Sequence, residues 1–91
     1  DACVEVPVLV DGTGLRPCSV GELPKSVRTF PQQHVAVQQL VVEGALENDR
    51  EKIHRAVKQD PLTAAELTLP EIHEMTEELL TKNEAYLPAL R

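Results

Sequence analysis

Residues 35–46 read VAVQQLVVEGAL and set the main requirement of the fold. In a helix, apolar side chains cover more than one stripe of this segment: Val35, Val37, Leu40, Val41, Val42, Ala45 and Leu46. A helix that is apolar over much of its circumference is normally buried on several sides. The few short helices that follow can hardly bury it alone. The sequence therefore predicts that this helix packs against protein outside the 91 residues.

The start of this helix is predicted near Pro31, directly after Thr29 and Phe30. Proline is favoured in the first turn of a helix. The stretch before it, GELPKSVRTFP at residues 21–31, contains two prolines and several polar residues. This composition predicts an irregular connection.

The N-terminal part has the pattern of a β-hairpin. A row of valines at every second position predicts a strand with one apolar face: Val4, Val6, Val8 and Val10. The glycine turn DGTG at residues 11–14 leads into a return strand at residues 15–20. A two-stranded ribbon is marginal in water, so the valine face requires a cover. Pro7 lacks an N–H and indicates an edge strand, or a strand bonded on only one side there.

The hairpin register separates the two cysteines. If Val10 opposes Leu15, then Cys18 faces Pro7, whereas Cys3 faces Glu22. We therefore expect two reduced, structural thiols in a reducing compartment.

Three further helical segments follow the long helix. Asn48 or Asp49 can cap the first, whose narrow apolar stripe of Ile53, Ala56 and Val57 predicts a half-exposed helix. After Asp60 and Pro61, residues 62–67 form a short turn of helix.

The last helix has a clear start. Thr68 and Glu71 fit a capping box, flanked by a hydrophobic staple of Leu67 and Ile72, and Pro88 is the predicted end. The fold class is thus α+β, with a hairpin at residues 1–22 followed by three to four helices within residues 31–91. Together they form a single partial domain over residues 1–91.

The composition narrows the classes of partner. The formal net charge of −6 disfavours nucleic acid and anionic membrane surfaces, and aromatic residues make up only 2%. The longest apolar run, residues 6–10, is far shorter than the ~20 residues of a membrane-spanning helix, and no signal sequence opens the chain. We expect a cytoplasmic protein.

The titratable residues form no recognisable catalytic pattern. His34, His54 and His73 lack the i, i+4 spacing of a helical zinc pair; we expect His54 and His73 on helix surfaces and His34 at a helix beginning. A run of carboxylates predicts a solvated face: Glu71, Glu74, Glu77 and Glu78.

Other residues that can carry chemistry also have simpler roles. Gly12 and Gly14 lead into a strand and predict a turn, not a phosphate cradle. Ser19 and Ser26 lack a nucleophile elbow and an adjacent base. The sequence thus assigns no catalytic, cofactor-binding or metal-binding residue to this chain.

Three stretches, taken in order, resemble the C-terminal segment of glycoside hydrolase family four. CVEVPVLVDGTGLRPCSVGELP at residues 3–24 is similar to the start of that segment, and residues 35–46 resemble the family's long helix. DPLTAAELTLPEIHEMTEELL at residues 60–80 resembles its closing part. The residues of the VEVP stretch resemble the branch of the family that acts on plain alpha-galactosides, glucosides or galacturonides more than the branch that acts on 6-phosphorylated sugars.

The resemblance implies a lactate-dehydrogenase-like, two-domain enzyme with NAD in an N-terminal Rossmann domain and a divalent metal, usually manganese. It implies oxidation at the sugar's C3, proton loss from C2, elimination of the glycosidic bond, addition of water and return of the hydride. The metal, nucleotide and base motifs precede the matching segment. Dimers or tetramers are expected, and Glu5 or His34 is the residue expected to reach the sugar pocket.

Two other functions fit the same residues. A free-standing acidic helical module could dock a partner through the valine face or the long helix. A small metal-dependent enzyme would instead use the histidines. Because Asp1 and Ala2 run directly into the predicted strand, we favour a piece of the larger glycosidase that is inactive in isolation.

Overall fold

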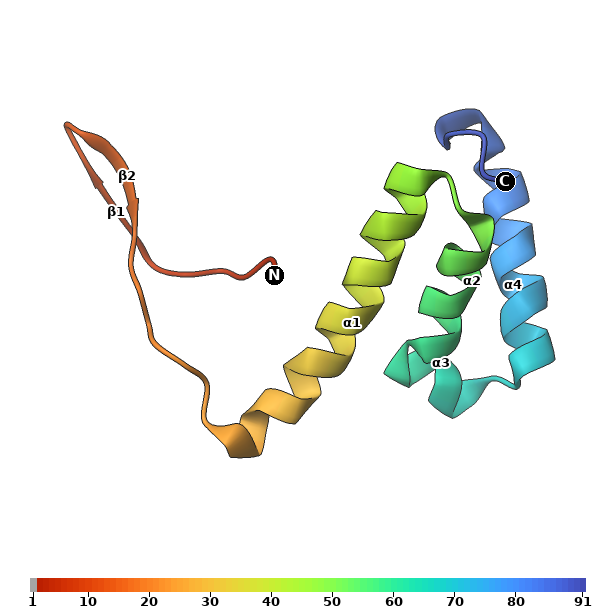
Figure 1. Ribbon diagram of the computed structural model, residues 1–91, viewed down its shortest axis with the longest axis horizontal. Coiled ribbons are helices and arrows are strands. Elements are labelled where there is room, and N and C mark those ends of the chain that lie inside the picture. The colour runs from red at the N-terminus through yellow and green to blue at the C-terminus, as the bar shows by residue number, and fades with distance from the viewer. Residues whose placement is uncertain (1) are drawn as a thin grey trace.

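A β-hairpin stands apart from a group of helices in the computed structural model, which describes residues 2–91 (Figure 1). The chain runs through β1 (Val8–Asp11), β2 (Gly14–Pro17), α1 (Lys25–Glu47), α2 (Arg50–Gln59), α3 (Pro61–Glu66), α4 (Leu69–Lys82) and the short 3-10 helix η1 (Glu84–Tyr86). The predicted order of a hairpin followed by three to four helices is confirmed.

The hairpin has the predicted register but shorter strands. Val10 opposes Leu15 and Val8 opposes Pro17, and the Cys18 N–H donates to the Pro7 carbonyl over 2.9 Å. Cys3 and Cys18 are both free thiols. The expected strands over residues 4–11 and 15–20 are wrong in extent, because the described chain supplies no covering layer that would hold longer strands together. Ala2 consequently does not lead directly into a strand.

Helix α1 starts earlier than its prolines suggested. The segment 25–30, expected to be an irregular connection, is helical, and Pro31 lies inside α1. Pro24 has a φ of −54° and its carbonyl accepts from the N–H groups of Val27 and Arg28, which builds the first turn. Pro31 therefore costs the helix its single bond to the Val27 carbonyl, and the helix continues through it.

A tight turn folds α2 back along α1. Asn48 adopts the left-handed conformation at a φ of 57°, and the Asp49 N–H donates to the Gly44 carbonyl over 2.8 Å. The Asp49 side chain then caps α2 by accepting from the Lys52 N–H over 3.0 Å. Helix α2 lies between α1 and α4 (Figure 1) and is half exposed, as expected: Ala56 is fully buried, whereas Glu51, Arg55 and Gln59 are exposed.

The later helices begin where their caps predict. Asp60 caps α3 through the Thr63 N–H at 2.9 Å. The capping box of Thr68 and Glu71 is formed at α4, where the Thr68 N–H donates to the Glu71 carboxylate over 2.8 Å. Helix α4 ends at Lys82 and not at Pro88.

The C-terminal residues close the helical group. After η1, the chain returns to the turn between α1 and α2, where the Arg91 N–H donates to the Asn48 carbonyl over 2.8 Å. The Arg91 carbonyl in turn accepts from the Arg50 N–H over 2.9 Å. The last residues therefore pair with the same turn that orients α2 against α1.

The core is small for the length of the chain. Among residues 2–91, the buried apolar side chains are Ala56 and Ile72. The radius of gyration is 17.1 Å, whereas a compact domain of this length has about 12 Å. The accessible surface is 7397 Å², against about 5,300 Å² for a compact monomer of this mass. The fold thus leaves an excess of about 2,100 Å² in contact with water.

Gly44 provides a test of the contact between α1 and α2. A Cβ added there would lie 2.8 Å from Ile53 Cδ1, 3.1 Å from Lys52 Cβ and 3.2 Å from the Asp49 carbonyl oxygen. The Ile53 methyl can rotate away, but the other two atoms are fixed at the start of α2. We expect Gly44→Ala to destabilise by about 1 kcal/mol, because overpacking exceeds the gain from removing a helical glycine.

The measurement is the urea midpoint from far-ultraviolet circular dichroism. Gly12→Ala is the matched control, because an added Cβ there meets no atom within 4 Å. An unchanged or raised midpoint for Gly44→Ala would contradict the expectation that overpacking exceeds the gain from removing a helical glycine.

Candidate functional site

The most tightly connected polar group joins α2 to α4. Arg50 grips the Glu77 carboxylate with two donors, Nε at 3.0 Å and an Nη at 2.7 Å. His54 Nε2 lies 2.5 Å from the same carboxylate. The His54 side chain is only 3% exposed, whereas those of Arg50 and Glu77 are 35% and 39% exposed. We call these three residues the α2–α4 cluster.

The cluster determines the tautomer of His54. An ionised Glu77 only accepts hydrogen bonds, so His54 Nε2 carries a proton and donates it. His54 Nδ1 is buried and has no hydrogen-bond partner among residues 2–91. On its face, His54 stacks on the exposed His73 ring, with centroids 4.5 Å apart and planes 26° apart. The imidazole is thus held from its edge and from one face.

The donors also stabilise the charge of Glu77. Hydrogen bonds from Arg50, and next from His54, lower the pKa of Glu77 from 4.5 to about 2. The same contact with Glu77 raises the pKa of Arg50. A carboxylate with so low a pKa, bound by two donors, is a poor proton acceptor near neutral pH. The cluster therefore acts as a structural connection between two helices.

Two sequence expectations fail at this cluster. His54 was expected on a helix surface and is buried, and Glu77 was expected on a solvated face but contacts α2. The missed signal is a pair of i, i+4 spacings, Arg50 with His54 and His73 with Glu77, that place matching polar groups on facing helices.

The other candidate residues lie separately. His34 is exposed on α1, Glu71 caps α4, and Glu78 pairs with Lys82 at 2.5 Å on the surface. Glu74 is exposed. Within residues 2–91, no group of three or more His, Cys, Asp or Glu side chains could hold a metal ion.

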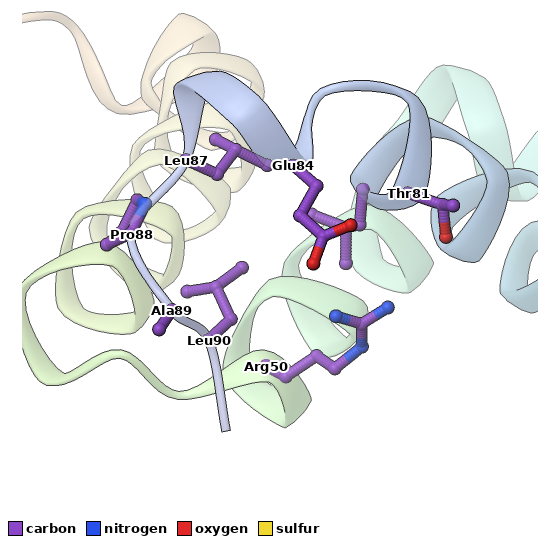
Figure 2. Close-up of a pocket in the computed structure, with 8 residues that line it drawn as sticks. Arg50, Thr81, Glu84, Leu87, Pro88, Ala89 and Leu90 are labelled. Carbon is purple, nitrogen blue, oxygen red and sulfur yellow. The ribbon is translucent and has the colours of Figure 1, made fainter.

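Two surface cavities remain to be considered. The first, of about 420 Å³, lies under the C-terminal segment; its lining includes Leu80 and seven residues labelled in Figure 2: Arg50, Thr81, Glu84, Leu87, Pro88, Ala89 and Leu90. Figure 2 shows the Glu84 carboxylate pointing toward the Arg50 guanidinium. Because Arg50 is already held by Glu77, this cavity has no unpaired cation to bind an anion.

The second cavity, of about 960 Å³, separates the N-terminal segment from α1. Its lining mixes alanine, cysteine and valines with glutamate and glutamine side chains: Ala2, Cys3, Val4, Glu5, Val35, Gln38, Gln39, Val42 and Glu43. Glu5 lies here, whereas His34 is not among the lining residues. Of the two alternatives, Glu5 or His34, the lining of this cavity includes Glu5, and the expectation that one of them reaches a sugar pocket stays a prediction.

Large apolar residues are exposed on α1 and on the hairpin. In α1 the side chains of Phe30 and Leu46 are 79% and 78% exposed, and Val42 is 56% exposed. On the hairpin, Val10 and Leu15 are 73% and 74% exposed. Within residues 2–91, no helix is long and apolar enough to cross a membrane. This surface is of the kind that protein partners cover.

The α2–α4 cluster predicts a pH dependence. The folded pKa of Glu77 is depressed, so its stabilising contribution is complete above 4.5 and is lost as the pH falls towards about 2. Glu77→Gln should lower the urea midpoint near neutral pH, and its difference from the unsubstituted chain should shrink below pH 4.5.

Glu78→Gln is the matched control for that series. Glu78 pairs only with Lys82 on the exposed face, where ion pairs contribute little. Equal midpoint shifts for the two variants at every pH would contradict the assigned role of Glu77.

The exposed apolar surface predicts the behaviour of the isolated chain. We expect it to self-associate or to melt with poor cooperativity, because its core is too small and its apolar faces lack cover. Light scattering and calorimetry measure both properties. A monomer with one sharp transition would contradict this expectation.

Comparison with known proteins identifies the family. Residues 1–63 match the Family 4 glycosyl hydrolase C-terminal domain. The chain is 31% identical over 87 residues to an alpha-galactosidase of Bacillus subtilis (strain 168), covering 96% of this chain and 20% of that protein. It is 31% identical over 87 residues to an alpha-galacturonidase of Lachnoclostridium phytofermentans, covering 96% and 19%.

A probable 6-phospho-beta-glucosidase of Bacillus subtilis is 33% identical over 88 residues, covering 97% of this chain and 19% of that protein. No solved structure matches the chain. The chain spans about a fifth of the length of these relatives. It therefore belongs to the family 4 glycosyl hydrolases, as part of their C-terminal domain.

Proposed function

We propose that this chain is the C-terminal structural part of an NAD- and Mn²⁺-dependent glycosidase and has no activity by itself. One observation carries the structural half of the proposal, the excess of about 2,100 Å² of accessible surface over that of a compact monomer. An excess of this size is more than twice the ~800 Å² that each partner contributes to a standard protein interface. Family membership supplies the glycosidase half.

The residues of this chain do not fit the two cofactors. Within residues 2–91 no cluster of metal-ligating side chains exists, and the DGTG turn leads into β2 and not into a helix N-terminus. We therefore place both the NAD site and the Mn²⁺ site in the preceding part of the protein. No chemical step is assigned to a residue of this chain.

The contribution of the chain is instead to position and to cover. Helix α1 presents apolar side chains along its exposed face, and the hairpin presents others far from the helices. Packed against an N-terminal Rossmann domain, these faces would complete the C-terminal domain and wall the sugar pocket. A cytoplasmic homo-oligomer is part of the same proposal, since some of the α1 surface can contact a second subunit.

The alternative is a free-standing acidic interaction module without catalysis. It also requires a partner for the exposed apolar face of α1 and for the hairpin. It differs from the glycosidase in one respect, because joining it to a family 4 N-terminal part would produce no hydrolysis.

Activity assays separate the two functions. The 91-residue chain, the preceding part of the protein and the complete protein are tested on p-nitrophenyl alpha-galactoside, alpha-galacturonides and 6-phospho-glucosides, with NAD and Mn²⁺ added or removed. We expect hydrolysis from the complete protein only, with loss on chelation and recovery with Mn²⁺. A complete protein that cleaves none of these, or cleaves without NAD, would exclude the proposal.

A further inference from the structure

The two outer edges of the hairpin are not equivalent. In an antiparallel pair, hydrogen-bonded and non-hydrogen-bonded residue pairs alternate. The Cys18 N–H to Pro7 carbonyl bond makes that pair a hydrogen-bonded one. By alternation, the pairs Val8 with Pro17 and Val10 with Leu15 direct their backbone groups away from the hairpin.

Only one of these edges can form a regular ladder with another strand. On β1, Val8 and Val10 both present an N–H and a carbonyl outward. On β2, Leu15 does so, but Pro17 has no N–H and interrupts the row. Proteins commonly block exposed strand edges with proline or charge. The edge of β2 is thus blocked, whereas that of β1 is open.

The side chains around the open edge are apolar as well. Directly opposed residues share a face, so Val8, Val10, Leu15 and Pro17 form one apolar face of the hairpin. Val8 is 46% exposed, and Val10 and Leu15 are more exposed still. The helices do not cover this face, since the hairpin stands apart from them (Figure 1). An open edge beside an uncovered apolar face is an aggregation site unless it is paired.

We propose that β1 is an inner strand in the complete protein and pairs along its outer edge with an extended segment of the preceding polypeptide. This inference rests on the proposed function, because the occupant is the part of the protein that the relatives have and this chain lacks. The chain spans about a fifth of those relatives, so ample polypeptide is available. A third strand beside β1 would also continue the apolar face and bring it under the same cover.

Amide hydrogen exchange in the complete protein tests the pairing. The Val8 and Val10 amides should exchange at least roughly tenfold more slowly than the Leu15 amide, because a hydrogen-bonded partner protects them. Val10→Pro and Leu15→Pro form a matched pair. Each removes one outward N–H from the same residue pair and spares the bonds of the hairpin itself.

We expect Val10→Pro to remove the protection of the Val8 amide and Leu15→Pro to preserve it. Equal exchange of Val8, Val10 and Leu15 in the unsubstituted protein would overturn the proposal, even if Val10→Pro failed to fold. Protection of Val8 in the complete protein that grows with protein concentration would also overturn it, because the occupant would then be a second copy. Glycosidase activity is measured separately, so an inactive protein with protected Val8 would reject the proposed function alone.

Discussion

Burial of apolar surface is the constraint on which the rest of this structure depends. Among residues 2–91, Ala56 and Ile72 are the fully enclosed apolar side chains, and the two longest apolar patterns, on α1 and on the hairpin, remain in contact with water. Hydrophobic burial is the dominant favourable term in folding, so this distribution limits the stability of the chain alone. The secondary structure is formed by local signals, and the described residues leave much of the apolar surface of α1 and of the hairpin uncovered.

Helix α2 is the centre of the part that does pack. It approaches α1 closely because Gly44 has no side chain, and it contacts α4 through the carboxylate that Arg50 and His54 share. The contact with α1 combines this close packing with ion pairs from Lys52 to Glu43 and Glu47, whereas the contact with α4 is centred on one shared carboxylate. Acid weakens the contact with α4, since protonation of Glu77 removes the negative charge that Arg50 and His54 share.

Local chemistry could be predicted from the sequence, and tertiary context could not. The DGTG turn predicted the hairpin register, and Thr68 with Glu71 predicted the start of α4. The pattern rules missed the helix before Pro31, because a proline inside the helix costs only one hydrogen bond. The same rules predicted that Glu77 lies on the surface. They consider where apolar residues recur along one helix, and not which polar residues face each other across two helices.

The exposed apolar faces of α1 and of the hairpin also reflect this tertiary context. An outward backbone row without proline, such as that of Val8 and Val10, and a helix apolar on several sides are liabilities in a protein that leaves them exposed. In β2, Pro17 stands on the outward row. Pro7, directly before β1, stands on the inward row, where it removes one bond of the hairpin and protects no edge. The hairpin therefore has a protected side and an open side, and such an asymmetry is the property of an edge pair within a larger sheet.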